Sequence, residues 1–342
     1  MKLKDIQLSN LSTYRGELMG LAMIFIIFFH VGVPRASSFY GLCRMGNVGV
    51  DMFFFLSGIG LWYSWMKSVG KASFPNNWMK FYIRRLWRVY PAWLIVALAF
   101  YVPDYLGERN FSKNVTDLIG DVAINWDFWM NDELTFWYIP ATMMLYLFAP
   151  PYMELIRRHP SYRWLPVAMV AWCTVVQWVA PVHQAVGHIE IFWSRVPIFF
   201  IGINMAEAVR RKSTMEGAAI GLLLIMFILP LASSMWLEQY RHGKFPLYTE
   251  RMLYIPLTVS ALLLFTMALR HAPQWLNRSL RFVGTISLEI YLLHFHFILR
   301  HFQGPGWNFW TRALACIAIV LPAAWVLHKI IEYVVNKLNP SR

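Results

Sequence analysis

Long apolar segments recur along the whole chain, and they limit its possible folds more than any other feature. In residues 15–34, for example, almost every side chain before Pro34 is apolar or glycine, apart from Arg15, Glu17 and His30. Over the 342 residues, 58% are hydrophobic and only 14% are charged, whereas soluble domains have about 25% charged residues. So few charges cannot cover a water-facing surface of this size. The sequence therefore predicts an integral membrane protein.

The number of membrane spans follows from the length of a transmembrane helix, about 20 mostly apolar residues. No small-residue cleavage site follows the first apolar segment, so we expect it to be retained as a span. We expect an all-α, polytopic fold in which residues 1–342 form a single domain. The ten predicted spans are 17–33, 47–66, 86–102, 134–155, 165–181, 193–209, 217–236, 252–269, 283–300 and 310–331.

The loop charges indicate how these spans are oriented. With the N-terminus inside, 21 of the 31 lysines and arginines fall on the inner side and ten on the outer side. Basic loops mark the cytoplasmic side of a membrane, so both termini are expected in the cytoplasm of a cell whose inner or plasma membrane holds the protein. The longest outer loop, 103–133, has seven acids and two bases and is expected to form an outer cap.

Charge and cysteine content exclude two other classes. The net charge is +13, but the basic residues are scattered between apolar segments, which does not suggest a nucleic-acid-binding patch. The three cysteines, Cys43, Cys173 and Cys316, are far apart, so we expect neither a disulfide framework nor a cysteine metal site. His294 and His296 are spaced wrongly for one helix face, and no metal site is predicted.

Polar residues inside apolar helices are costly and therefore point to function. His30 closes the first span. Asn47 and Asp51 are four residues apart and share a helix face, while Gly46 and Gly49 would allow another helix to approach closely. Asp51 has two interpretations: it orients a catalytic histidine or binds a polar substrate, or it forms an interhelical hydrogen bond.

Three further groups of polar or aromatic residues each have two interpretations. The arginines near the inner end of the third span either anchor the helix in anionic lipid or bind phosphates. Trp137 and Tyr138 either belong to an interfacial aromatic belt or stack on a sugar. Polar residues on one face of the ninth span either line a cavity or join helices. The arginines are Arg84, Arg85 and Arg88, and the ninth-span residues are Ser287, Tyr291 and His294.

Taken together, these motifs resemble the membrane acyltransferase 3 family of integral-membrane acyltransferases, many of which O-acetylate cell-surface glycans. The matching stretches occur in order and together on a ten-span chain. They are Gly20-Leu-Ala followed by Phe29-His30, Gly49 to Gly58, Arg84 to Pro91, Phe136-Trp-Tyr, and Ser287 to His294. The resemblance implies an acyl-CoA donor, acetyl as the group transferred to a polysaccharide or lipid-linked sugar, a catalytic His30 and an arginine cluster at Arg84, Arg85 and Arg88.

One family residue is missing from this chain. The family usually has arginine or lysine eleven residues before the histidine, where this chain has Met19. Arg15 lies one turn lower on the same helix face, and we expect it to supply the missing charge.

The spacing along the first span suits acyl transfer from a long carrier such as acyl-CoA. His30 lies 13 residues after Glu17, about 20 Å along a helix, so a carrier with phosphates at the inner face and a long arm could reach it. We expect His30 to act as a general base on an acceptor hydroxyl, with Asp51 as its orienting group; transfer through an acyl-His30 intermediate is the other route. A transporter or flippase of a glycan or lipid intermediate and a membrane scaffold are the competing functions. Acceptor identity and oligomeric state stay open.

Overall fold

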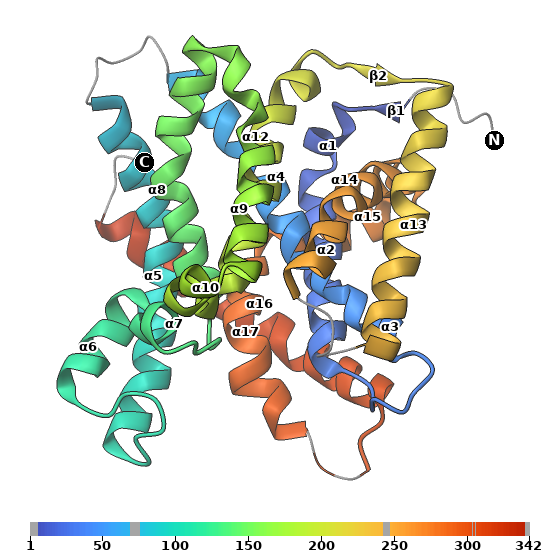
Figure 1. Ribbon diagram of the computed structural model, residues 1–342. Helices are drawn as coiled ribbons and strands as arrows, with labels where there is room; N and C mark the ends of the chain where they lie inside the picture. The colour runs from blue at the N-terminus through green and yellow to red at the C-terminus, as the bar shows by residue number, and fades with distance from the viewer. Residues whose placement is uncertain (1–5, 69–75, 242–246, 303, 305, 339–342) are drawn as a thin grey trace.

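The computed structural model describes residues 6–68, 76–241, 247–302, 304 and 306–338 (Figure 1). In this part of the chain the fold is helical apart from one antiparallel pair of two-residue strands, β1 (Ile6–Gln7) and β2 (Thr214–Met215). The sequence did not predict these strands because two residues are too few for an alternating pattern. Five basic residues of the charge pattern lie outside the described residues: Lys2, Lys4, Lys71, Lys244 and Arg342.

Every predicted span contains helix, which agrees with the all-α prediction. The α-helices are α1 (Asn10–Thr13), α2 (Arg15–Val31), α3 (Tyr40–Arg44), α4 (Val48–Ser68), α5 (Asn76–Leu106), α6 (Val115–Ile124), α7 (Trp126–Met130), α8 (Tyr138–Arg158), α9 (Leu165–Trp178), α10 (Ala180–Val186), α11 (Glu190–Trp193), α12 (Val196–Arg210), α13 (Ala218–Arg241), α14 (Leu247–His271), α15 (Gln274–Thr285), α16 (Ser287–Leu293) and α17 (Phe309–Leu338). Short 3-10 helices are η1 (Met45–Asn47), η2 (Pro160–Trp164), η3 (Gly187–Ile189) and η5 (Leu299–Phe302), and η4 (His294–Ile298) is a π-helix.

Fewer helices than expected are long and apolar enough to cross a membrane. Among the described residues there are five: Tyr40–Ser68, Trp78–Leu106, Ala218–Arg241, Glu250–His271 and Phe309–Leu338. Two bent pairs raise the number to seven, Pro160–Trp178 with Ala180–Trp193 at 98° and Gln274–Thr285 with Ser287–Phe302 at 63°. The remaining predicted spans lie in α2, α8 and α12. Of these, α2 has 17 residues and α12 has 15, which is short for a full crossing.

Glycines let α2 pack closely against two neighbours. A Cβ atom at Gly49 would collide with the carbonyl of Ala22, and one at Gly46 would collide with the carbonyl of Phe25. The expected close approach of another helix to these glycines is therefore confirmed. On the other side of α2, a Cβ at Gly284 of α15 would collide with the carbonyl of Gly16. These contacts hold α2, and with it His30, between α4 and α15.

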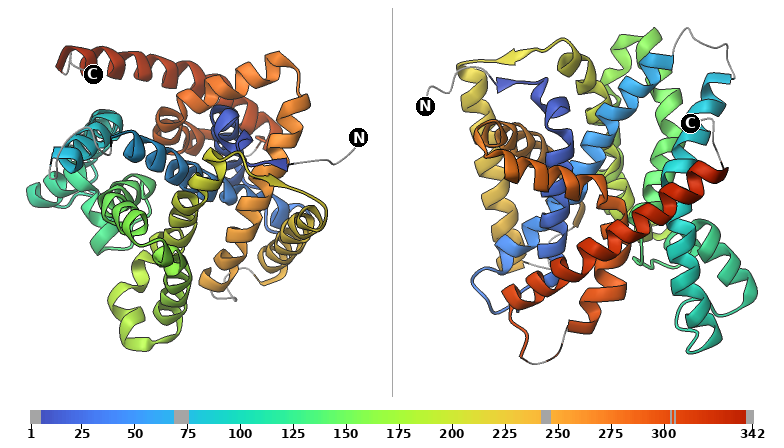
Figure 2. Two further views of the ribbon diagram at one scale, coloured as in Figure 1. Left: turned by 90° about the horizontal axis from the view of Figure 1, so that it is seen from above. Right: turned by 180° about the vertical axis from the view of Figure 1, so that it is seen from behind.

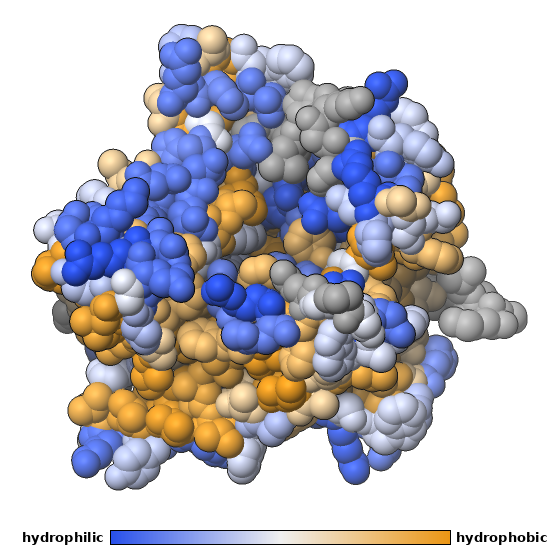
Figure 3. All heavy atoms as spheres, turned by 90° about the horizontal axis from the view of Figure 1, so that it is seen from below, coloured by the Kyte–Doolittle hydropathy of each residue, from blue (hydrophilic) through white to orange (hydrophobic). Residues whose placement is uncertain are grey.

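The arrangement of the helices leaves α2 and α4 in the interior, whereas α17 runs obliquely across one side of the molecule (Figures 1 and 2). The β1–β2 pair lies at one end, and α6 and α7 lie at the opposite end (Figure 1). From that opposite end, hydrophilic side chains gather on the left of the view, and apolar surface adjoins them (Figure 3). The acid-rich segment expected as a cap thus projects from the end opposite the strands.

Two acids of this segment, Asp121 and Asp127, are buried. The Asp121 carboxylate accepts hydrogen bonds from Ser112 Oγ at 2.7 Å and from the Asp127 main-chain N at 3.1 Å. Burial raises the pKa of this carboxyl to about 6, although the bond from Ser112 acts in the opposite direction. Asp121 therefore joins the segment internally, and the acids of 103–133 other than Asp121 and Asp127 supply its exposed charge.

Candidate functional site

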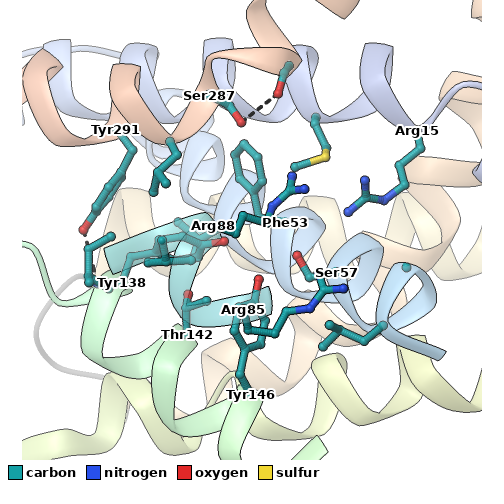
Figure 4. A pocket seen from close by; sticks show the side chains of 18 of the residues that line it. Arg15, Phe53, Ser57, Arg85, Arg88, Tyr138, Thr142, Tyr146, Ser287 and Tyr291 are labelled. Atoms are coloured by element: carbon teal, nitrogen blue, oxygen red, sulfur yellow. Dashed lines mark hydrogen bonds between the residues drawn. The ribbon is translucent and has the colours of Figure 1, made fainter. Parts of the chain in front are cut away.

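A cavity of about 300 Å³ opens between α2, α4, α5, α8 and the bent pair α15–α16 (Figure 4). None of the described residues that line it is acidic, and three are arginines. The lining residues are Arg15, Met19, Ile26, Val50, Phe53, Ser57, Gly60, Leu61, Arg85, Arg88, Val89, Tyr138, Ile139, Thr142, Tyr146, Gly284, Thr285, Ser287, Leu288 and Tyr291. A space with three arginines and no carboxylate among its described lining residues is suited to an anionic ligand.

The arginines reach this cavity from two helices (Figure 4). Arg15 of α2 donates from Nε to the Leu56 main-chain oxygen at 3.2 Å. Its guanidinium lies over Gly60, where a Cβ atom would be only 3.3 Å from Nη2. Arg85 of α5 donates to Ser64 Oγ at 2.9 Å, and Arg88 lies one turn further along α5. The acceptors of these two bonds, a main-chain carbonyl and a hydroxyl, are neutral and orient Arg15 and Arg85.

Arg84 does not belong to this set. Its side chain is exposed, it donates from Nε to the main-chain oxygen of Lys80 at 3.1 Å, and it does not line the cavity. The sequence grouped it with Arg85 and Arg88 because Arg84 is four residues and Arg85 three residues before Arg88 at the start of the third span. On a helix, however, Arg84 and Arg85 point about 100° apart, so two adjacent arginines need not reach one ligand.

Hydroxyl and aromatic side chains line other parts of the wall. Tyr138, at the start of α8, donates from its main-chain N to Tyr291 Oη at 3.2 Å, which joins α8 to α16. Ser287 Oγ donates to the Gly284 oxygen at 2.9 Å. Ile26 also lines the cavity, and its main-chain oxygen lies 2.9 Å from His30 Nδ1. The cavity therefore extends from the arginines to within one helical turn of His30.

His30 lies against a histidine of a different helical segment. His294 Nε2 is 3.1 Å from His30 Nδ1, and the ring centroids are 4.8 Å apart. His294 is buried, whereas His30 is partly accessible. The sequence placed His294 with Ser287 and Tyr291 as a substrate-binding residue. Only Ser287 and Tyr291 line the cavity, and His294 is instead the hydrogen-bonding neighbour of His30.

Among the described residues, no hydrogen bond joins Asp51 to His30. Asp51 Oδ2 lies 3.5 Å from Nη2 of Arg195, and both side chains are buried. Arg195 Nη2 also lies 3.3 Å from the Asn47 side-chain amide. In the orientation that satisfies this amide, its oxygen accepts from Arg251 Nη1 at 2.7 Å and Nη2 at 2.9 Å. The Arg195 guanidinium lies 5.7 Å from the centroid of the Trp137 ring. These contacts agree with the interhelical interpretation of Asp51 and Asn47. Asp51 pairs with an arginine from the start of α12, and its orienting role toward His30 stays a prediction.

Sequence reasoning missed Arg195 because its charge placed it with the outer-side basic residues, and no local pattern distinguishes a buried arginine there from an exposed one. The Asn47 and Trp137 side chains lie beside Arg195 and do not line the cavity. Ser57, Thr142 and Tyr146 were also missed, although they line it. Their spacing on α4 and α8 gives no signal until both helices are placed beside α5.

Fold and site together define a polytopic helical membrane protein with a basic cavity that leads toward a pair of histidines. The chain belongs to the acyltransferase family: the model of that family, described as an acyltransferase domain, matches residues 18–329, nearly the whole chain. The resemblance seen in the sequence motifs is thereby confirmed, and the protein is an acyltransferase by family.

One curated relative is similar over part of its length. It is the protein described as regulator of hypoxia-inducible factor 1 from Caenorhabditis elegans, with 27% identity over 128 residues. The matched region covers 34% of this chain and 25% of the relative, so the likeness concerns a quarter of that protein. No solved structure matches the chain.

Proposed function

We propose that the protein transfers an acyl group, most simply acetyl, from acyl-CoA to a hydroxyl of a carbohydrate such as a surface polysaccharide or a lipid-linked sugar. The observation that carries this proposal is the cavity. Arg15, Arg85 and Arg88 lie on its wall, none of the described lining residues is acidic, and the cavity reaches to within one turn of His30. Coenzyme A combines a polyanionic nucleotide with a long thin arm that ends in the thioester. Its phosphates suit the arginines, and its arm would extend along the cavity toward His30.

In the proposed reaction His30 is the general base. Its Nε2 takes the proton of the acceptor hydroxyl while that oxygen attacks the thioester carbonyl. The C–S bond then breaks, the acyl group stays on the acceptor oxygen, and the proton passes from His30 to the departing thiolate. The products are the O-acyl carbohydrate and free CoA. No metal takes part in these steps.

The orientation belongs to the same proposal. Basic loops favour the cytoplasmic side, so the arginine end of the cavity faces the compartment where acyl-CoA is made, and both termini lie on that side of the inner or plasma membrane. The acceptor approaches from the opposite end, where the acid-bearing α6–α7 segment lies. Ten crossings are part of this topology, with the short helices α2 and α12 completed by their neighbours.

A direct assay tests the proposal with purified protein in nanodiscs. Acyl-CoA labelled in the acyl group is mixed with a candidate polysaccharide or lipid-linked sugar, and free thiol and labelled acceptor are followed together. We expect both to appear in equal amounts. A protein that moves the sugar across a bilayer without releasing thiol would be a transporter, and the proposal would be wrong.

Replacing Arg15 tests whether it supplies the cation that this chain lacks at Met19. We expect Arg15→Ala to raise the Kd for acyl-CoA by about tenfold to a hundredfold, the effect of losing one charge-assisted hydrogen bond. Met19 also lines the cavity, so adding Met19→Arg to this variant should restore most of the affinity. Calorimetric titration measures both. An unchanged Kd for acyl-CoA in Arg15→Ala would show that Arg15 does not bind the donor.

A further inference from the structure

The two histidines meet where the second of them leaves regular α-helix. His294 begins the π-helical turn η4, directly after α16. Such turns are rare and often occur at functional sites, because one extra residue re-aims the side chains that follow. Here the turn brings a ring from residue 294 against a ring from residue 30, at the C-terminal end of α2.

The hydrogen bonds of His294 determine which nitrogen carries its proton. Its Nδ1 lies 2.8 Å from the main-chain oxygen of Tyr291 and 3.1 Å from that of Ile290. A carbonyl oxygen can only accept, so Nδ1 must be the protonated nitrogen. In the neutral ring, Nε2 is then the acceptor. This is the nitrogen that faces His30 at 3.1 Å.

The same reasoning assigns the proton of His30. Its Nδ1 lies between two acceptors, the Ile26 oxygen at 2.9 Å and His294 Nε2 at 3.1 Å. Nδ1 of His30 must therefore carry a hydrogen, which these acceptors share. Neutral His30 consequently has an unprotonated Nε2, and this nitrogen forms no hydrogen bond with the described residues. The lone pair that a general base needs is on the nitrogen left available.

We infer that His294 is a positioning residue that holds His30 in its reactive tautomer and orientation. The inference rests on the proposed function, in which His30 takes the acceptor proton. When Nε2 of His30 gains that proton, the ring becomes an imidazolium, and its Nδ1–H bond to His294 becomes charge-assisted and stronger. His294 thus takes the orienting role of the third member in a nucleophile–base–orienter set, a role that the sequence had given to Asp51.

Main-chain contacts hold His294 in place for this role. Two carbonyls accept from its Nδ1, and Cys316 of α17 approaches the His294 main-chain oxygen with its thiol at 3.8 Å. His296, two residues later, lies in a different environment, with its ring centroid 4.7 Å from that of Phe136 and 5.2 Å from that of Phe100. His296 therefore serves as a matched control, because it is a histidine of the same turn that belongs to an aromatic cluster.

Two substitutions at His294 separate positioning from packing. The Gln side chain keeps an oxygen that can accept from His30 Nδ1, whereas Leu fills similar space with no acceptor. We expect His294→Leu to lower kcat by about tenfold to a hundredfold, the worth of one hydrogen bond to a charged group. His294→Gln should recover part of the loss, and the KM for acyl-CoA should change less than about twofold in both. His296→Phe should keep wild-type kcat.

A second readout does not depend on activity or on the stability of any variant. In wild-type protein with ¹⁵N-labelled histidine, the ring nitrogens of His30 should show one protonated Nδ1 and one bare Nε2. Signals of the opposite tautomer, or of an even mixture, would overturn the inference. In His294→Leu we expect the population to move toward the mixture.

The kinetic outcomes distinguish the inference from the proposed function beneath it. If His30→Ala is inactive but His294→Leu retains wild-type kcat, the positioning role is wrong and the function stands. A raised KM with unchanged kcat in His294→Leu would mean that His294 binds substrate, and the inference would be overturned. Full activity in His30→Ala would show that His30 is not the general base, and both proposals would fail.

Discussion

Replacing His30 by alanine is expected to lower kcat by about 10²-fold to 10⁴-fold, the range that a positioned general base contributes. The substitution removes the nitrogen that takes the acceptor proton, but it leaves the arginine-lined cavity intact because His30 does not line it. Acyl-CoA should therefore bind with nearly unchanged Kd. Single-turnover transfer of labelled acyl groups measures the first effect, and calorimetric titration measures the second.

The control for His30→Ala is its folding in the membrane. His30 is partly accessible and lies at the end of α2. Its truncation should not disturb the close contacts lower in that helix, where Gly20 meets the Leu280 carbonyl and Ala22 meets Gly49 of α4. Size-exclusion elution and thermal melting in detergent should match the wild type. A folded His30→Ala protein that transfers acyl groups at the wild-type rate would contradict the proposed mechanism.

The second large effect is expected from Arg85→Ala combined with Arg88→Ala. Each arginine can form charge-assisted hydrogen bonds to phosphate, and each such bond contributes about 1.5–3 kcal/mol. Removing both should raise the Kd for acyl-CoA by at least about a hundredfold. Calorimetric titration with acetyl-CoA and with CoA measures the loss, and wild-type binding should weaken as salt is raised.

Arg84→Ala is the matched control for this pair, because it removes an arginine of the same helix that is exposed and does not line the cavity. It lowers the net charge by one and should leave the Kd for acyl-CoA within about twofold of the wild type. An equal loss of acyl-CoA affinity in Arg84→Ala and in the double variant would mean that the general positive charge of the protein, not the cavity, binds the donor. That result would contradict the assignment of the cavity as the acyl-CoA site.

The helices could be predicted from the sequence because a membrane helix has to be apolar over most of its length. That signal is present even in α2 and α12, which are too short to cross alone. The bends and breaks within the helical segments were harder to predict. The 63° bend between α15 and α16 falls between Thr285 and Ser287 with no proline to mark it, and the predicted span 283–300 ran through it.

The site was predicted in part. Residues on adjacent helical turns, such as Arg85 with Arg88 and Ser287 with Tyr291, do line one cavity, because helical spacing alone relates them. Contacts between distant helices could not be derived in this way. His30 and His294 are 264 residues apart in the chain, and Asp51 meets Arg195 across 144 positions. Such pairs depend on how helices pack, which the composition of each helix does not determine.

The buried pair also changes what a mutation at Asp51 would report. Removing one partner of a buried ion pair leaves the other charge uncompensated, which costs about 3–5 kcal/mol. A loss of activity in an Asp51 variant would therefore reflect the stability of the α4–α12 contact as readily as catalysis. For this reason the catalytic role of His30 is better tested at His294, whose hydrogen bond to His30 is direct.

Protection of a cysteine inside the cavity tests the central claim most directly, namely that acyl-CoA occupies the space between the arginines and His30. Ser57→Cys adds a thiol to the wall with little change in size, and native Cys43 provides an internal control because it lines a separate apolar cavity. Both are alkylated with a small reagent, with and without acetyl-CoA, and quantified by peptide mass spectrometry. We predict that acetyl-CoA protects Cys at position 57 and leaves Cys43 unaffected. Equal alkylation of position 57 with saturating acetyl-CoA and without it would contradict the account.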